Sequence, residues 1–167
     1  MLLIINRFSE LNYSKLMNVY LEYIINAGKE HYPYFSDEEQ RFHAEFDFYH
    51  YLNSVFFRQP NSFYAIWEDG GEYKAALRLE PYCDGLLLCA LETAPEARQH
   101  GFATSLIESV LRYLREQNIG TIYSHVSKTN IPSMKVHLKC GFQITGNHAV
   151  HLDGSVLRNS YTLSFIY

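Results

Sequence analysis

A change of hydrophobic period within residues 86–114 constrains the fold more than any other feature of this sequence. Residues 86–91 form a continuous apolar run, which is typical of a strand covered on both faces. Further along, apolar residues recur at intervals of three and four, as they do on the packed face of a helix. These residues are Ala103, Leu106, Ile107, Val110, Leu111 and Leu114. The sequence therefore predicts a strand, a short loop and a helix in direct succession.

The loop between these two elements has a pattern suited to binding an anion. It reads Arg98-Gln99-His100-Gly101-Phe102-Ala103, followed by Thr104. The first N–H groups of a helix have no partner inside the helix and lie at the positive end of its dipole. Gly and Ala in the loop let a ligand approach the backbone closely. We expect a diphosphate-binding loop, with ordinary packing of an α/β unit as the alternative.

Two stretches of the chain resemble one family. Residues 91–103, LETAPEARQHGFA, are similar to the acyl-CoA motif of GNAT-type N-acetyltransferases, a Pro-x-x-Arg lead-in followed by Arg/Gln-x-x-Gly-x-Gly/Ala. Residues 130–142, NIPSMKVHLKCGF, resemble the next helix of that family, which starts at an Asn, has a small residue three positions later and ends at Gly-Phe. The two motifs occur in the family's order. The resemblance is specific over roughly residues 62–145.

The resemblance implies a single GNAT-like domain over residues 1–167, of the mixed α/β class. Its fold would be one mixed, mostly antiparallel sheet flanked by helices, in the order β-α-α-β-β-β-α-β-α-β-β. Patterns along the chain agree with this order. They predict strands at 2–5, 63–67, 73–79, 86–91, 121–126, 142–151 and 155–166, and helices at 12–28, 36–58, 103–114 and 130–141.

The two helices before the hairpin have recognisable ends. Gly28 is expected to stop the first, and Ser36 with Glu39 forms a capping box at the start of the second. The predicted packing line of the second helix is Phe42, Phe46, Tyr49, Leu52, Val55 and Phe56. In the family the first two helices border the acceptor pocket. Six further aromatic side chains are therefore candidates to line it, with ordinary packing or a dimer face as the alternative: Tyr32, Tyr34, Phe35, Phe48, His50 and Tyr51.

Composition narrows the class of protein. With 14 basic and 18 acidic residues the chain is not a polycation, so we expect no nucleic-acid partner. Cys83, Cys89 and Cys140 are odd in number and lack CxxC spacing, which predicts reduced thiols in a cytoplasmic protein and no metal site. The apolar start, MLLIINRF, is too short for a signal peptide or a membrane span, so we expect no membrane partner.

The activity implied by the resemblance is transfer of an acetyl group from acetyl-CoA to a primary amine, by direct attack of the amine. The acceptor would be a small molecule or a peptide, and a homodimer is possible. Backbone N–H groups of the loop would hold the diphosphate, and main-chain groups of the preceding strand would hold the pantetheine arm. The implied cofactor-binding residues are Leu91, Glu92, Thr93, Arg98, Gln99, His100, Gly101, Phe102, Ala103, Thr104, Asn130 and Ser133.

The reaction needs a group that takes a proton from the amine. An alkylamine with a pKa of about 10.4 is mostly charged at pH 7 and must lose a proton before it attacks. His125 is the first candidate, because it lies five residues before Asn130, where several family members carry a Glu base. Its imidazole titrates near neutral pH. Glu92, on the central strand, is the second candidate, and a structural role for His125 is the alternative.

The departing thiolate must also receive a proton. In the family a Tyr seven residues after the Asn often supplies it, and His137 occupies that position here. A Tyr with a pKa of about 10 is protonated at pH 7, whereas a histidine near 6.5 is roughly one-quarter cationic. His137 is therefore the candidate acid, with water as the alternative.

Three other functions are compatible with parts of the sequence. A non-catalytic acyl-CoA sensor or interaction module on the same fold would account for the missing Tyr. A dinucleotide or P-loop site is weaker, because the loop has one Gly where a Rossmann fingerprint has three and lacks Gly-Lys-Ser/Thr. A zinc site at His148 and His151 is weaker still.

Overall fold

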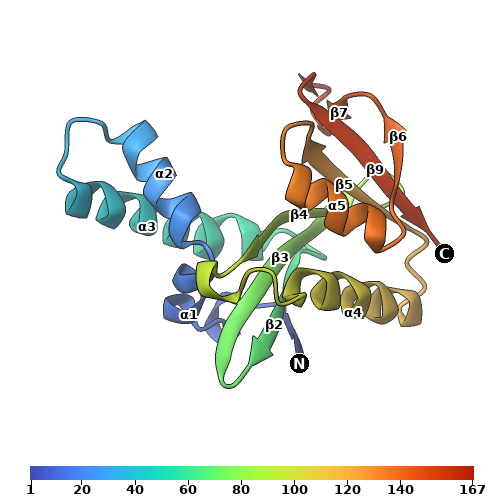
Figure 1. Cartoon of the computed structure of the whole chain (residues 1–167), viewed down its shortest axis with the longest axis horizontal. Coiled ribbons are helices and arrows are strands. Elements are labelled where there is room, and N and C mark those ends of the chain that lie inside the picture. The colour runs from blue at the N-terminus through green and yellow to red at the C-terminus, as the bar shows by residue number, and fades with distance from the viewer.

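The computed structural model describes all residues, 1–167, and contains one seven-stranded sheet flanked by helices (Figure 1). The strand order is β1-β2-β3-β4-β5-β9-β6, and β4 with β5 is the parallel pair among otherwise antiparallel neighbours. The strands are β1 Leu2–Ile5, β2 Phe63–Asp69, β3 Glu72–Tyr82, β4 Gly85–Thr93, β5 Thr121–Ser127, β6 Gln143–Gly146 and β9 Ser160–Ile166. A separate two-stranded ribbon joins β7 Ala149–Val150 and β8 Val156–Leu157. The predicted mixed, mostly antiparallel α/β fold is confirmed.

Five α-helices cover the sheet on both faces (Figure 1). They are α1 Tyr13–Val19, α2 Leu21–His31, α3 Asp37–Ser54, α4 Phe102–Glu116 and α5 Ile131–Lys139, with short 3-10 turns η1 Phe8–Glu10, η2 Phe56–Arg58 and η3 Pro95–Ala97. Helices α4 and α5 pack on one face, and α1 with the end of α3 and η2 pack on the other. Helices α2 and α3 form an antiparallel hairpin that extends beyond the sheet.

Alternation along β3 separates the two cores. Ala75, Leu77 and Leu79 point into the core that contains α4, whereas Ala76 belongs to the core of α1 and α3. Successive side chains of a strand point to opposite faces, so one apolar strand can serve both cores. The predicted apolar face of α4 is buried as expected: Leu106, Ile107, Val110, Leu111 and Leu114.

The predicted end of the first helix at Gly28 is wrong. The segment forms two helices that meet at Tyr20, and the second continues through Gly28 to His31. A Cβ atom at Gly28 would lie 2.7 Å from the carbonyl oxygen of Gln40. The glycine is therefore required by the close approach of α2 and α3, and the helix continues past it.

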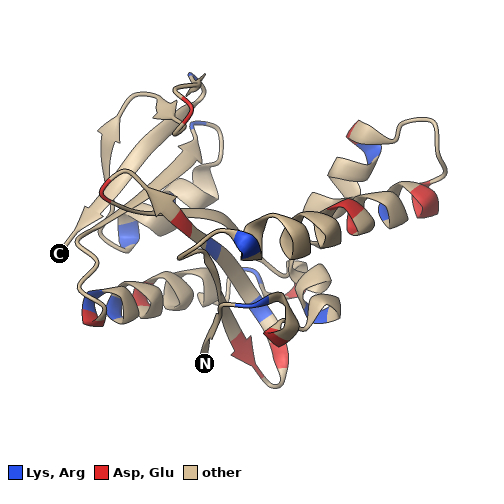
Figure 2. Cartoon of the chain, turned by 180° about the vertical axis from the view of Figure 1, so that it is seen from behind, with Lys and Arg blue, Asp and Glu red and all other residues tan.

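The predicted packing face of α3 is wrong for four of its six residues. Phe42, Phe46, Tyr49 and Val55 are between 41% and 65% exposed, and the helix ends at Ser54. Leu52 and, in η2, Phe56 are buried as predicted, and the other buried residues of α3 are Gln40, Ala44 and Phe48. Helix α2 lies against this second face, and its contacts decide which of two aromatic faces is covered. The acidic first turn of α3, visible in Figure 2, suits the positive end of the helix dipole.

The C-terminal strands are more broken than predicted. Residues 142–151 and 155–166 contain β6, β7, β8 and β9, and β6 pairs with β9 while β7 pairs only with β8. The predicted Asp-Gly turn is present: Gly154 has φ of 85°, and the Ser155 N–H donates to Oδ1 of Asp153 at 2.8 Å. The register of β6 against β9 shifts between Ile144 and Gly146, which ends the pairing early.

Candidate active site

The site is built around a bulge in β4. Arg78 pairs with Cys89 and Ala76 pairs with Glu92, so Ala90 and Leu91 together lie opposite Leu77. Ala90 has φ of 51°, a left-handed conformation that marks the extra residue of the bulge. The hydroxyl of Tyr20 donates to the Ala90 carbonyl at 2.6 Å and holds it from the α2 side.

Beyond the bulge, β4 and β5 separate. Their parallel pairing covers only three residue pairs and ends at Leu88 and Ser124. Main-chain groups of β4 from Cys89 onward therefore have no partner on β5. Parallel strands that diverge in this way leave an edge on which a ligand can bind as an added strand.

A cleft of about 650 Å³ runs from this opening to the start of α4, and we call it the loop cleft. Eleven of the twelve cofactor-binding residues predicted from the sequence line it: Leu91, Glu92, Thr93, Arg98, Gln99, Gly101, Phe102, Ala103, Thr104, Asn130 and Ser133. His100 does not. Its ring is exposed, with Nδ1 2.7 Å from the Arg98 carbonyl oxygen. The structure thus brings two distant motifs to one cavity.

The loop presents unpaired backbone donors to this cleft. None of the N–H groups of residues 99–104 donates a hydrogen bond within the chain. Gln99 and Gly101 have φ of 64° and 83°, and α4 starts at Gly101 without a side-chain cap. These donors lie at the positive end of a 15-residue helix, which is a favourable position for a phosphate or diphosphate.

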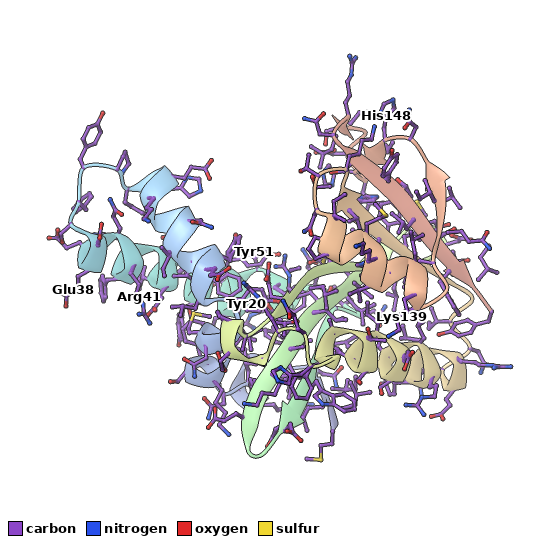
Figure 3. All side chains as sticks on the ribbon, in the orientation of Figure 1. Tyr20, Glu38, Arg41, Tyr51, Lys139 and His148 are labelled. Atoms are coloured by element: carbon purple, nitrogen blue, oxygen red, sulfur yellow. The ribbon has the colours of Figure 1, made fainter.

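The Arg98 side chain does not point at the loop donors. Its guanidinium forms a bidentate ion pair with Glu22 of α2, at 3.0 and 2.8 Å. Two further cations on the cleft wall are Lys135 and Lys139, one turn apart on α5, and Figure 3 shows Lys139 at the end of that helix beside α4. Sequence reasoning missed both lysines, although their i, i+4 spacing after Asn130 places them on one helix face.

A small pocket of about 150 Å³ lies between the separating strands, and we call it the strand pocket. It shares Leu91, Asn130 and Ser133 with the loop cleft and includes His125 and His137. Side chains alternate along β5, so Ser124 and His125 point to opposite faces of the sheet. The two predicted catalytic histidines therefore approach the strand pocket from different sides.

His137 has contacts that do not suit a proton donor. It is 1% exposed, its Nδ1 lies 2.8 Å from the Ser133 carbonyl oxygen, and its Nε2 lies 3.0 Å from Oγ of Ser124. A carbonyl oxygen only accepts, so Nδ1 carries the hydrogen and Nε2 accepts from the serine. Burial lowers the pKa of His137, which keeps the ring neutral at pH 7. The prediction that His137 protonates the thiolate does not fit this arrangement.

We expect His137 to make the fold sensitive to acid. Its pKa is below the usual 6.5 in the folded protein, so the unfolded chain binds the proton more readily. Its contribution to stability is complete above pH 6.5 and is lost as the pH falls below that value. In urea denaturation of the wild type, this group should lower the free energy of unfolding by about 1 kcal/mol for each pH unit below 6.5, until His137 is also protonated in the folded protein.

The matched measurement uses His137→Phe and, as a control, the exposed His50→Phe. The first variant should unfold with a weaker dependence on pH between 6.5 and 5. The control should keep the wild-type dependence. Equal slopes in all three proteins would show that burial of His137 does not govern the acid sensitivity.

His125 has no partner for either ring nitrogen. Both are buried and unpaired, and the ring makes edge contacts with Tyr82 at 5.3 Å and His151 at 5.7 Å. Burial, with a smaller effect of His151, lowers the pKa of His125. The imidazole is therefore neutral at pH 7 and has a free lone pair with which to accept a proton.

Glu92 lies on β4 just beyond the bulge and lines the loop cleft. It is half-buried, and desolvation raises the pKa of its carboxyl, an effect that Arg98 opposes and Glu22 reinforces. Perturbed carboxyl groups of this kind are common at catalytic sites and also occur in structural networks. The structure therefore keeps both predicted base candidates near the strand opening.

A third cavity, of about 400 Å³, lies where the α2–α3 hairpin meets the sheet, and we call it the hairpin pocket. It shares Ala90 with the strand pocket, so the three cavities follow one another around the bulge. Of the six aromatic side chains suggested for an acceptor pocket, Tyr32, Phe48 and Tyr51 line it. The other three, Tyr34, Phe35 and His50, are exposed outside it.

No three His, Cys, Asp or Glu side chains gather in a way that could hold a metal ion, so the weak zinc motif at His148 and His151 has no further ligands. None of the helices is both long enough and apolar enough to cross a membrane.

Comparison with known families identifies the chain. It matches the family model described as Acetyltransferase (GNAT) family over residues 15–142, which is most of its length. The protein therefore belongs to the GNAT acetyltransferase family, as the two sequence motifs indicated. No curated protein sequence matches the chain significantly.

Solved structures of acetyltransferases share the fold of this chain. The PaiA N-acetyltransferase from Thermoplasma acidophilum, in complex with coenzyme A, aligns with a TM-score of 0.67 at 13% identity, covering 100% of this chain and 99% of that one. Aminoglycoside 6'-acetyltransferase type Ii aligns with a TM-score of 0.64 at 15% identity, covering 99% and 96%. The ribosomal-protein-S18-alanine N-acetyltransferase from Escherichia coli aligns with a TM-score of 0.57 at 14% identity, covering 99% and 94%. The TM-scores and coverage show a shared fold, and at these identities the likeness extends to the fold alone.

Proposed function

We propose that this protein transfers the acetyl group of acetyl-CoA to the primary amine of a small molecule or peptide. The observation that carries the proposal is the series of three connected cavities around the β4 bulge. The first offers anion donors, the second is small and polar, and the third is lined by aromatic side chains. Each matches one part of the reaction: the nucleotide end of the donor, the thioester and the acceptor.

The donor would bind along the loop cleft. Its diphosphate would accept hydrogen bonds from the free N–H groups of residues 99–104, and Lys135 and Lys139 would balance its charge. The pantetheine arm would extend along the main chain of Leu91, Glu92 and Thr93, the part of β4 that β5 leaves unpaired. Two structural relatives were solved in complex with coenzyme A, which supports coenzyme A as the carrier of the acetyl group.

The thioester would then lie at the strand pocket. The main-chain N–H of Leu91, next to the bulge and lining this pocket, would polarise the thioester carbonyl and stabilise the negative charge that forms on it. The amine attacks the carbonyl carbon, a tetrahedral intermediate forms, and the carbon–sulfur bond breaks. Since the single proton of the neutral His137 ring is held by Ser133, we assign protonation of the thiolate to water.

The amine must lose one proton in this step. His125 and Glu92 are the two groups able to take it, directly or through water. Glu92 has a pKa raised above 4.5 and His125 has a pKa lowered below 6.5. Whichever acts, the base is active when deprotonated, so turnover of the bound complex should fall as the pH drops below about 6.5.

Two variants separate the candidate bases. Glu92→Gln and His125→Phe each remove one of them, and loss of the true base should lower kcat by about 100-fold or more. The same variant should lose the acidic limb of the pH–rate profile, whereas the other keeps it. The exposed His148→Phe serves as the control. If both variants keep a near-normal kcat and the wild-type pH–rate profile, neither Glu92 nor His125 is the base.

The first test of the whole proposal is a thermal melt with and without acetyl-CoA. Ligand at about 100 times its Kd should stabilise the folded protein by roughly 2.7 kcal/mol. Release of free CoA thiol in the presence of a panel of amines should follow. Stabilisation without CoA release from any amine would favour the acyl-CoA sensor, and no stabilisation at millimolar acetyl-CoA would reject both functions.

A further inference from the structure

The wall of the hairpin pocket contains a largely buried cation, Arg78, which makes one long ion pair and donates no hydrogen bond within the chain. The Arg78 side chain is 17% exposed, and its guanidinium donates none of the hydrogen bonds found in the structure. Its Nε is fully buried without a partner. A guanidinium has five N–H donors and stays charged at any physiological pH. A buried Nε–H without an acceptor is costly, and the other N–H groups at the pocket wall have no acceptor within the chain.

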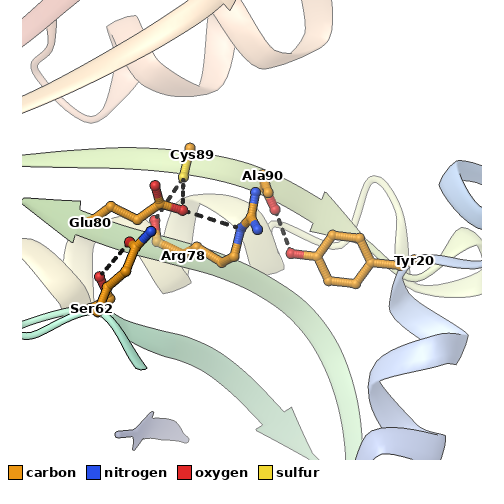
Figure 4. Close-up of polar contacts among 7 residues, drawn as sticks. Tyr20, Ser62, Arg78, Glu80, Cys89 and Ala90 are labelled. Carbon is orange, nitrogen blue, oxygen red and sulfur yellow. Dashed lines mark hydrogen bonds and ion pairs between the residues drawn. The ribbon is translucent and has the colours of Figure 1, made fainter. Parts of the chain in front are cut away.

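The neighbours of Arg78 hold it in place without satisfying it. The nearest carboxylate oxygen, on Glu80, lies 3.8 Å from Nε, too far for a hydrogen bond (Figure 4). The ring centroids of Tyr51 and Phe56 lie 5.1 and 5.5 Å from Cζ of Arg78, close enough for cation–π interactions with the guanidinium. These contacts orient the guanidinium of Arg78 and leave its terminal N–H groups free to bind a ligand in the hairpin pocket.

Arg78 is also next to the proposed point of reaction. It pairs across the sheet with Cys89, the residue before Ala90, and Ala90 lines both the hairpin pocket and the strand pocket. Figure 4 shows the guanidinium between Glu80 and the Tyr20–Ala90 hydrogen bond. A group bound to Arg78 therefore lies a short distance from the acetyl group that the strand pocket would present.

The carboxylates near the pocket leave the guanidinium donors of Arg78 without an acceptor. Asp47 lines the pocket and accepts a hydrogen bond from the hydroxyl of Tyr32, and Glu22 is paired with Arg98. Glu80 forms an ion pair with Arg78 at 3.8 Å, too long for a hydrogen bond. The free N–H donors of Arg78 at the pocket wall therefore call for an anionic acceptor on the ligand. Planar, bidentate carboxylate is the partner that a guanidinium fork matches best.

We infer that the acceptor is a small amino acid-like molecule, whose carboxylate binds Arg78 while its amine, a few bonds away, faces Ala90. This inference rests on the proposed acetyl transfer and specifies its acceptor. The pocket volume of about 400 Å³ fits a small molecule, and Tyr20, Tyr23, Phe48 and Tyr51 give it an apolar wall for a hydrophobic side chain. Tyr20 and Tyr51 lie together where the hairpin joins the sheet (Figure 3).

The test compares acceptors that differ only in charge. L-amino acids and their amides are supplied in pairs to the wild-type protein with acetyl-CoA, and CoA thiol release gives kcat/KM for each. The acid should be preferred over its amide by about 10- to 100-fold, the worth of a charge-assisted hydrogen bond. The amine of the amide is less basic, so a larger fraction of it is neutral and reactive at pH 7. Amine reactivity alone would therefore favour the amide, which is the opposite of the expected result.

Binding is measured separately with 3-phenylpropionate, which has the carboxylate and an apolar body but no amine. Calorimetry in the presence of CoA should show binding to the wild type, and Arg78→Met should abolish it together with the preference for acids. The exposed Arg41→Met is the charge-matched control and should behave as the wild type. Arg78→Lys keeps the charge without the fork and should retain only part of the preference.

The outcomes separate this inference from the proposed function. Equal use of acids and amides, or 3-phenylpropionate binding that survives Arg78→Met, would overturn the inference and leave acetyl transfer to amines standing. Binding that depends on Arg78, with no CoA release from any amine, would support the anion site and reject the transfer. If Arg78→Met does not fold, the comparison of the wild type with Arg78→Lys decides by the same criteria.

Discussion

Replacing Gly101 by Asp should weaken acetyl-CoA binding by about 100- to 1,000-fold, because two unit charges about 4 Å apart near a protein surface repel by about 4 kcal/mol. Gly101 is the residue at which α4 begins, at the centre of the free N–H groups of the loop. A carboxylate there would occupy the positive end of the helix dipole and repel the diphosphate. Isothermal titration with acetyl-CoA measures the loss directly.

The fold should tolerate this change. Gly101 has φ of 83°, a region that Asp enters more easily than most residues, and a Cβ there would meet no atom within 4 Å. Gly154, in the turn after β7, has φ of 85° and equally open surroundings. Gly154→Asp therefore introduces the same strain and charge elsewhere and should keep wild-type affinity. Equal affinities in the two variants would mean that the diphosphate does not bind at the start of α4.

Replacing Gly85 by Ala should destabilise the protein by about 3 kcal/mol or more, at the upper end for overpacking. Gly85 is the first residue of β4, and an added Cβ would lie 2.0 Å from the carbonyl oxygen of Thr121 on β5. Backbone atoms cannot rotate away as side chains do, so one strand must move. The three parallel pairs of β4 and β5 that end at the strand opening would move with it.

The control for this prediction is Gly120→Ala. Gly120 directly precedes Thr121, and a Cβ there would meet nothing within 4 Å. This variant should unfold within about 0.5 kcal/mol of the wild type. Urea denaturation of the three proteins gives the comparison. A Gly85→Ala midpoint close to that of the control would show that the two strands have room to separate without loss of stability.

Features that depend on residues close in sequence were predictable. The capping box is present as expected: Glu39 accepts from the Ser36 N–H at 2.9 Å, and the Ser36 side chain accepts in return. The Asn130 side chain caps α5 by accepting from the Ser133 N–H at 3.1 Å. Each of these contacts spans three residues, so its geometry follows from local conformation alone.

Glycine shows where this reasoning fails. The sequence suggested that Gly28 ends a helix, since glycine commonly punctuates elements. Instead Gly28 lies within α2 and Gly85 is the first residue of β4, and at both positions a neighbouring backbone comes too close for a Cβ. The neighbours, Gln40 and Thr121, are 12 and 36 residues away, and no local pattern names them.

The sequence by itself determined the fold class, the order of the central elements and the loop at the start of α4, because hydrophobic period, caps and two spaced motifs are local properties of the chain. Tertiary structure alone decided which face of α3 is buried, which acidic residue holds Arg98 and which ring nitrogens of His137 are occupied. It also placed Arg78 at the wall of a pocket without a hydrogen-bond partner. Such features arise where segments far apart in sequence pack together, and their energies depend on burial and on partners that only the folded chain brings within reach.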